Sequence, residues 1–361
     1  DGVAIREYEH TVLDLATALR NHTSPREVAG LCLRDDGGAV KTPARELSTN
    51  LDALPFVSAV YKRHLNYRNY FYAHSPYPIV VTITGRGCPH QCIYCVYPQT
   101  FSGHRLRYRS IGNVVEEIAY ILKDFPDVRE IMFEDDTLTF NKQRCIAFAE
   151  EILRRNLKFA WSANSRAEVD LETMQLLKRA GARLFCVGIE SGNQATLDRM
   201  RKKLRIERIR QFFRDARQAG ILIHGCFLMG LPGETRETMN QTLSLAKELN
   251  PDTAQFFPLM VYPGTEAYRW AQAEEYLVTQ DFRQWVTPEG LRHCVVSRPG
   301  LTNQDLVKFC DRARREFYLR PAYVGRKLIQ SLTDLHECQR LLKGAWSLSR
   351  HLFQRPPVGK C

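Results

Sequence analysis

Three of the eleven cysteines lie within one short stretch, GCPHQCIYC, at Cys88, Cys92 and Cys95. Thiolates are soft ligands that favour iron–sulfur clusters, zinc or Cu(I). The other cysteines are scattered, and no second pair completes a four-ligand structural zinc site. Three thiols with one open position are typical of a reactive centre, and a four-iron four-sulfur cluster held in this way leaves one iron free. Coincidence or a redox pair is the alternative.

Six apolar runs place this loop in a larger pattern, at residues 78–84, 128–134, 158–164, 183–190, 221–230 and 252–260. Near-continuous apolar runs are typical of parallel strands buried on both faces. Amphipathic helical stretches separate them, among them 171–180, 206–219 and 234–249. The alternation predicts an α/β fold, either a doubly wound sheet or a closed or partial barrel. Reactive residues are then expected at the carboxyl ends of the strands, where the cysteines already lie.

Polar residues follow each of the later strand candidates. They are Glu134, Asp135 and Asp136 after the second, Asn164 and Arg166 after the third, Glu190 and Ser191 after the fourth, Gly230 to Thr235 (GLPGET) after the fifth and Tyr262 to Thr265 (YPGT) after the sixth. Each motif alone has a simpler interpretation. The acidic triplet reads as a solvated turn or a divalent-metal site, Glu190 as a strand-end charge, and GLPGET as a turn with a helix cap.

The C-x3-C-x2-C spacing, the aromatic Tyr94 before its last cysteine and the ordered strand ends together resemble the radical S-adenosylmethionine (SAM) superfamily. The resemblance implies a partial (β/α)6 TIM-like barrel and a [4Fe–4S] cluster on Cys88, Cys92 and Cys95. It also implies that SAM binds the open iron and is cleaved to a 5′-deoxyadenosyl radical. The implied cofactor-binding residues are Tyr94, Glu134, Asp135, Asp136, Arg166, Glu190, Ser191 and Gly230. An acidic residue of the triplet would contact the methionyl amine, and Glu190 with Ser191 the ribose. No catalytic residue beyond the cluster and its cofactor is implied.

Residues 1–60 resemble the segment that follows a cobalamin-binding domain in one branch of this superfamily. The signature Asp-x-His-x-x-Gly of that domain is absent, and Asp334-Leu335-His336 is its nearest match. We therefore expect residues 1–75 to be a remnant or linker after a missing domain, 76–265 the core barrel and 266–361 a helical extension. Cobalamin is expected only in a longer protein.

The stretch CVYPQTFSGHRLRYRS, from Cys95 to Ser110, resembles hopanoid-biosynthesis-associated members of that branch. This implies a reaction that remodels a lipid head group into a cyclitol, while the wider branch implies radical methylation of an unactivated carbon. Two alternatives are a tRNA methylthiotransferase, which carries three further cysteines where this chain has only Cys32, and a non-enzymatic iron–sulfur electron carrier. Within the stretch, the basic run from His104 to Arg109 either positions a polar substrate or is a solvated loop; we favour the loop.

The charge of the chain is unevenly distributed. The formal net charge of the chain is +11. Residues 301–361 contain twelve basic and five acidic residues, so much of this charge lies near the C-terminal end. Such a tail is a solvated helical face or a surface for nucleic acid, anionic lipid or an acidic partner. Its apolar residues Trp346, Leu348, Leu352 and Phe353 favour peripheral membrane contact, and nucleic acid is not expected. Without a secretory signal or an apolar span we expect an enzyme in the cytoplasm or at the inner face of the membrane, reduced by flavodoxin or ferredoxin.

Overall fold

A six-stranded parallel sheet forms the centre of the computed structural model, which describes residues 2–72, 74–286 and 293–333. The strands are β4 (Ile79–Thr82), β7 (Glu130–Phe133), β8 (Trp161–Ser165), β9 (Ala182–Glu190), β10 (Leu222–Met229) and β11 (Thr253–Pro258). Their order is β11-β10-β9-β8-β7-β4, so every strand lies beside its neighbour in the sequence. The sheet therefore winds in one direction and stays open between β4 and β11. This confirms the partial barrel and excludes a doubly wound sheet.

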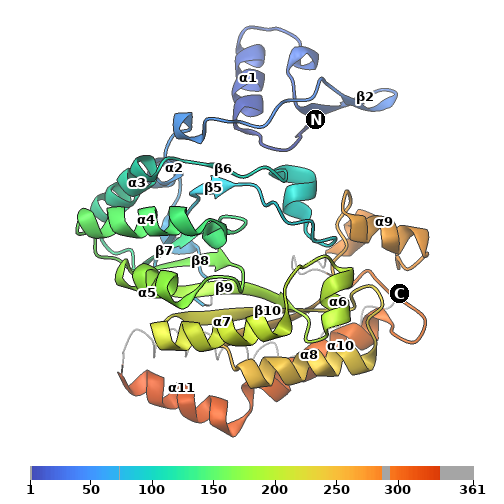
Figure 1. Ribbon diagram of the computed structural model, residues 1–361. Coiled ribbons are helices and arrows are strands. Elements are labelled where there is room, and N and C mark those ends of the chain that lie inside the picture. The colour runs from blue at the N-terminus through green and yellow to red at the C-terminus, as the bar shows by residue number, and fades with distance from the viewer. Residues whose placement is uncertain (1, 73, 287–292, 334–361) are drawn as a thin grey trace.

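Helices connect the strands and cover the outer face of the sheet (Figure 1). They are α3 (Ile111–Asp124), α4 (Lys142–Arg154), α5 (Leu171–Arg179), α6 (Gln194–Arg199), α7 (Ile206–Ala219) and α8 (Arg236–Leu249). The predicted helix 206–219 is confirmed, and Gly220 ends it in the left-handed region with φ 71°. Helix α8 begins after the Thr235 cap, two residues later than expected. Between helices and sheet, the edge-to-face rings of Phe133, Phe148 and Trp161 are buried.

The N-terminal segment is more regular than the sequence indicated. Strands β1 (Gly2–Ala4), β2 (Leu31–Asp35) and β3 (Gly38–Lys41) form an antiparallel sheet that packs with α1 (Glu9–Arg20). A small core of Ala18, Val28 and Leu31 holds this unit together. The sequence does not predict these strands because they are short and β3 is exposed along its length. Helix α2 (Val57–His64) then leads into the barrel.

The helices after the barrel are α9 (Glu266–Ala273), α10 (Asn303–Tyr318) and α11 (Pro321–Thr333). Helix α10 packs against the edge strand β11, where the Tyr318 hydroxyl accepts from the Ala254 amide at 2.8 Å and donates to its carbonyl at 2.6 Å. No described helix is long and apolar enough to cross a bilayer. The predicted roles of Trp346, Leu348, Leu352 and Phe353, and the Asp334-Leu335-His336 match, lie outside the described residues.

Candidate active site

The three clustered cysteines lie on a loop at the carboxyl end of β4, as expected for a reactive site in this fold. Short strands β5 (Gly85–Arg86) and β6 (Arg107–Tyr108) pair at the base of this loop. Backbone contacts fix its shape. The Gln99 amide donates to the carbonyls of Cys92 at 3.2 Å and Cys95 at 2.7 Å, and His104 Nδ1 lies 3.2 Å from the carbonyl oxygen of Cys88. The conformation of the loop is therefore fixed by its own side chains.

The chemistry of the three thiols fits an iron–sulfur cluster. All three are free, Cys92 is buried and the other two are half-buried. Burial raises the pKa of Cys88, and raises that of Cys95 to about 12. Nearby cations favour the thiolate, Arg166 at Cys88 and Lys202 at Cys95. Within the described ranges, no three His, Cys, Asp or Glu side chains meet at one ion position. Three cysteines on a four-iron cluster bind different irons and need not meet, so the set fits a cluster better than zinc.

The acidic triplet after β7 divides into one open and two occupied carboxylates. Asp135 is buried and accepts from the Thr84 amide and hydroxyl, both at 2.6 Å. Asp136 Oδ2 accepts from the Gly87 amide at 2.9 Å and the Ser102 hydroxyl at 2.8 Å. These two residues therefore fasten the cysteine loop to the sheet, a different role from the cofactor contact expected of them. Glu134 is the exposed member of the triplet, and partial burial raises the pKa of its carboxyl against the opposing effect of a hydrogen bond with Asn164.

A buried polar centre joins β9 to the cysteine loop. Glu190 Oε1 accepts from the Tyr94 hydroxyl and from Lys202 Nζ, each at 2.9 Å, and Lys202 also donates to the Tyr94 hydroxyl at 3.1 Å. Burial disfavours the ammonium, but the charges of Glu190 and Cys92 together with the hydrogen bond to Glu190 outweigh it and raise the pKa of Lys202. Among the contacts of the described residues, Glu190 Oε2 has no hydrogen bond. One carboxylate oxygen is thus fixed by protein while the other is left for a ligand.

Lys202 was not among the site residues predicted from the sequence. It lies in the run Arg201-Lys202-Lys203, which is typical of a solvated surface. Its side chain is nevertheless only 7% exposed, and Gly188 leaves the space that it occupies. A Cβ at Gly188 would lie 2.9 Å from Lys202 Nζ and 2.2 Å from a Glu190 oxygen. The signal in the sequence was Gly188, which lies two residues before Glu190 and leaves space for a buried partner of that carboxylate.

Arg166 lies where the third strand ends, as expected, and it is buried. Its guanidinium donates to Glu168 at 3.0 Å and to the Lys202 carbonyl at 2.6 Å. Asn164, on the same strand, donates to the Asp135 carbonyl at 3.1 Å. Arg166 therefore orders the segment that carries Lys202, beside the cysteines.

Two predicted contact residues are occupied elsewhere. Ser191 is fully buried, and its hydroxyl lies 3.2 Å from that of Thr242 on α8, so it is not open to a ribose. Gly230 has φ 92°, its amide donates to Glu234 at 2.7 Å, and a Cβ there would lie 2.6 Å from Leu306. The requirement for glycine comes from this turn and its packing against α10. GLPGET is thus a turn and helix cap, the simpler of its two interpretations.

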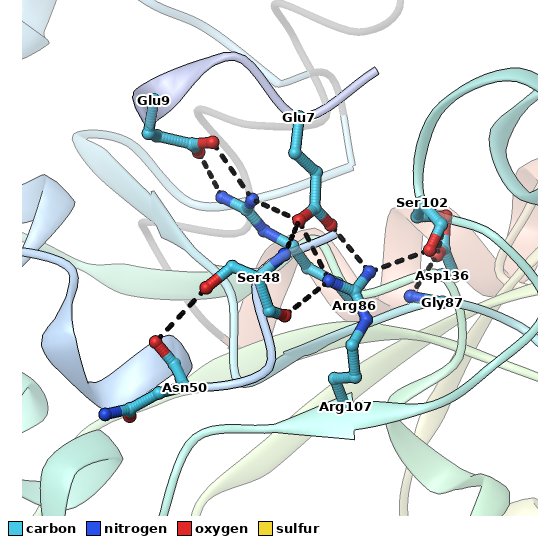
Figure 2. A network of polar contacts seen from close by, with 9 residues as sticks. All are labelled: Glu7, Glu9, Ser48, Asn50, Arg86, Gly87, Ser102, Arg107 and Asp136. Carbon is cyan, nitrogen blue, oxygen red and sulfur yellow. Dashed lines mark hydrogen bonds and ion pairs between the residues drawn. The ribbon is translucent and has the colours of Figure 1, made fainter. Parts of the chain in front are cut away.

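The basic run from His104 to Arg109 is only partly a solvated loop. His104 and Arg105 are exposed, but Arg107 and Arg109 are buried. Arg107 donates to both oxygens of Glu7, at 2.8 and 2.6 Å, and to the Ser102 carbonyl at 2.7 Å, so it ties the N-terminal segment to the cysteine loop (Figure 2). The solvated-loop prediction is therefore wrong for these two arginines, since alternate residues turn inward where the run enters β6.

A polar patch lies on the inner face of the sheet. The rings of His74 and His224 stack with centroids 5.0 Å apart, and Cys186 Sγ lies 3.5 Å from His74 Nε2. Burial lowers the pKa of His224, which therefore stays neutral at pH 7. Neighbouring Gln255 on β11 is exposed. Cys186 and Cys226 also lie on this inner face and are partly buried.

Comparisons with known proteins place this geometry in a family. The model of the Radical SAM superfamily matches residues 82–246. An uncharacterized methyltransferase of Pyrococcus horikoshii is 30% identical over 93% of this chain and 70% of its own length. The chain belongs to the radical SAM superfamily. Members of this superfamily use a [4Fe–4S] cluster and SAM.

A cyclase and a second methyltransferase are also similar to this chain. An anaerobic magnesium-protoporphyrin IX monomethyl ester cyclase of Rubrivivax gelatinosus is 27% identical over 74% of this chain, which spans 48% of that protein. The structure of the radical SAM methyltransferase TsrM from Kitasatospora setae, with tryptophan and a SAM analogue bound, superposes with a TM-score of 0.67. It has 19% identity and covers 86% of this chain and 67% of its own. The likeness to TsrM confirms the fold alone.

Proposed function

We propose that this chain is the radical SAM part of an enzyme that transfers a methyl group to an unactivated carbon of a small molecule or lipid head group. The observation that carries the proposal is the meeting of three free thiols with the Glu190–Lys202–Tyr94 centre at the carboxyl end of one barrel. Methyl transfer is favoured over ring formation or a cyclitol rearrangement because the methyltransferase relative matches 93% of the chain and the cyclase 74%.

The cofactors would be held by residues that the structure leaves available. Cys88, Cys92 and Cys95 would ligate three irons of a [4Fe–4S] cluster. When bound, this cluster supplies the electron that cleaves the sulfonium of SAM, which makes hydrogen removal from an inert C–H bond possible. Glu134 would accept from the methionyl amine, since it is the exposed member of its triplet. Glu190 Oε2 would accept from a ribose hydroxyl while Lys202 and Tyr94 hold the other oxygen.

The protein itself has to position reactants and exclude water, and the barrel supports both tasks. The inner face offers the neutral His224, together with His74 and Gln255, as hydrogen-bonding groups for a substrate. The neutral His224 ring and the Gln255 amide carry no charge, which favours a substrate that is neutral where it enters the barrel. Phosphate or carboxylate groups of a substrate would remain outside it.

The experiment is anaerobic reconstitution of the chain with iron and sulfide, followed by dithionite and SAM. We expect 5′-deoxyadenosine or S-adenosylhomocysteine as products. The Cys92→Ala variant should lose both, because it lacks one of three cluster ligands. A Cys145→Ala variant is the matched control, since Cys145 is a buried thiol on α4 outside the loop. Equal product from the Cys92 and Cys145 variants would overturn the cluster assignment.

A further inference from the structure

A groove of about 500 Å³ opens on the outer side of the cysteine loop. Three separate segments line it: the N-terminal segment, the cysteine loop and the start of α9. The lining residues are Arg6, Leu47, Pro98, Gln99, Gly103, His104, Arg105, Gly264 and Arg269. Three arginines and one histidine are among them, and no acidic residue is. The groove is therefore a positively charged surface.

Its arginines are not used to hold the fold together. Arg6, Arg105 and Arg269 are exposed, and among the described residues none of them is within ion-pair distance of a carboxylate. In the part of the chain that the structure describes, Arg269 donates to the Gly264 carbonyl alone, at 3.4 Å. The nearby acids Glu7 and Glu9 are already paired with Arg86 and Arg107, as Figure 2 shows. The positive charge of the groove is thus left for a partner.

The groove lies directly behind the cluster ligands. Two of its lining residues, Gln99 and His104, contact the backbone carbonyls of all three cysteines at 2.7–3.2 Å. The thiols themselves interact with Arg166 and Lys202 on the barrel side of the loop. An electron that enters from the groove therefore passes the backbone that carries the three thiols, on the side of the loop away from Arg166 and Lys202.

The form of the groove favours a protein over a small anion. Within the described part of the chain, no lining side chain has a buried polar atom without a partner, as a built small-molecule site would present. Exposed aromatic side chains adjoin the basic groups instead. Tyr97 is 57% and Tyr8 52% exposed, and Tyr8 packs on Phe101 of the same loop at 6.3 Å. Tyrosine beside arginine is typical of a protein–protein interface.

We propose that this groove docks an acidic one-electron carrier protein, of flavodoxin or ferredoxin type, that reduces the cluster. The inference rests on the proposed function, since only a redox cluster needs such a donor. In each docking event the reduced carrier loses one electron and the oxidised cluster gains it. Attraction between the acidic carrier and Arg6, Arg105 and Arg269 would speed the encounter. The electron would then pass from the groove to the cluster near Gln99 and His104.

The test compares two reductants on the cluster-loaded chain, a reduced acidic flavodoxin and dithionite, with 5′-deoxyadenosine formation as the readout. The variant is Arg105→Glu/Arg269→Glu. The control, Lys158→Glu/Arg214→Glu, makes the same charge change at two exposed cations before β8 and on α7. We expect the flavodoxin-driven rate of the groove variant to fall at least about tenfold, and the control to keep the original rate. The groove variant should also lose the dependence of that rate on salt, while its dithionite-driven rate should match the control.

Two results would overturn the docking proposal. One is an equal flavodoxin-driven rate in the groove variant and the control. The other is equal slowing of the groove variant with both reductants, which would mean that the arginines act on the cluster itself. If inorganic pyrophosphate binds in the groove but does not slow reduction by flavodoxin, the groove is a site for a small anion instead. If dithionite gives no product with the unaltered chain, the proposed function fails, and this outcome is separate from the docking result.

Discussion

Replacement of Arg109 by methionine is expected to destabilise the chain by about 3 kcal/mol. Arg109 is 8% and Glu117 1% exposed, and they form an ion pair where the cysteine loop returns to the barrel. Methionine retains the apolar stem and fills a similar volume, but it cannot donate. The variant therefore leaves a buried carboxylate without its cation.

The expected loss of stability depends on the hydrogen bonds that Glu117 keeps in the variant. Its oxygens still accept from the Ser58 amide at 3.1 Å, the Ser58 hydroxyl at 2.7 Å and the Thr82 hydroxyl at 2.9 Å. Loss of one partner of a buried pair costs roughly 3–5 kcal/mol, and these neutral donors hold the cost near the lower value. Arg109 also donates to the Ile83 carbonyl at 2.8 Å, which loses this donor in the variant.

The assay is urea-induced unfolding of the cluster-free chain under reducing conditions, with Arg105→Met as the matched control. Arg105 belongs to the same basic run but is exposed, so its replacement should change the free energy of unfolding by less than about 0.5 kcal/mol. The double variant Arg109→Met/Glu117→Gln removes the unpaired charge and should recover part of the loss. A cost for Arg109→Met equal to that of Arg105→Met would refute the assignment of a buried ion pair.

Three further predictions concern the polar groups of the barrel. Lys202→Met should weaken SAM binding to the cluster-loaded protein roughly tenfold, measured by equilibrium binding, because Glu190 loses the cation that orients it. Glu134→Gln should weaken SAM binding by a similar factor, whereas Asp135→Asn should lower the thermal midpoint instead, since Asp135 holds Thr84. Unchanged binding in both the Lys202 and Glu134 variants would contradict the site. Burial raises the pKa of Glu234 from 4.5 to about 7, so the folded state keeps a proton that the unfolded state releases, and stability falls as pH rises from about 4.5 to 7. Relative to the original chain, Glu234→Gln should therefore gain on the order of 3 kcal/mol in free energy of unfolding over that range, and a pH-independent difference would contradict this.

Much of the barrel could be predicted because its strands are apolar along most of their length. The near-continuous apolar runs marked all six strands to within a few residues, and Gly220 marked the end of α7. The N-terminal sheet carried no such signal. Its strand β3 is exposed at every residue, and only Ala18, Val28 and Leu31 form a core under the sheet.

The site was predictable in its residue types and less so in its side-chain directions. The sequence placed Glu134, Asp135 and Asp136 together, but which carboxylate stays open depends on Thr84 and Gly87, which come from an earlier strand and loop. The buried partners Lys202 and Arg107 looked like surface cations, because a basic run does not reveal which members have an acidic residue across the fold. Such long-range pairs are set by the topology of the barrel.

The central claim is that three thiols hold a cluster with one iron open to SAM. Its most direct test is electron paramagnetic resonance of the reduced, cluster-loaded chain with and without SAM. We expect one [4Fe–4S] cluster per chain, which is lost in Cys92→Ala and whose spectrum shifts when SAM is added. A cluster that forms but keeps the same spectrum with SAM would contradict it.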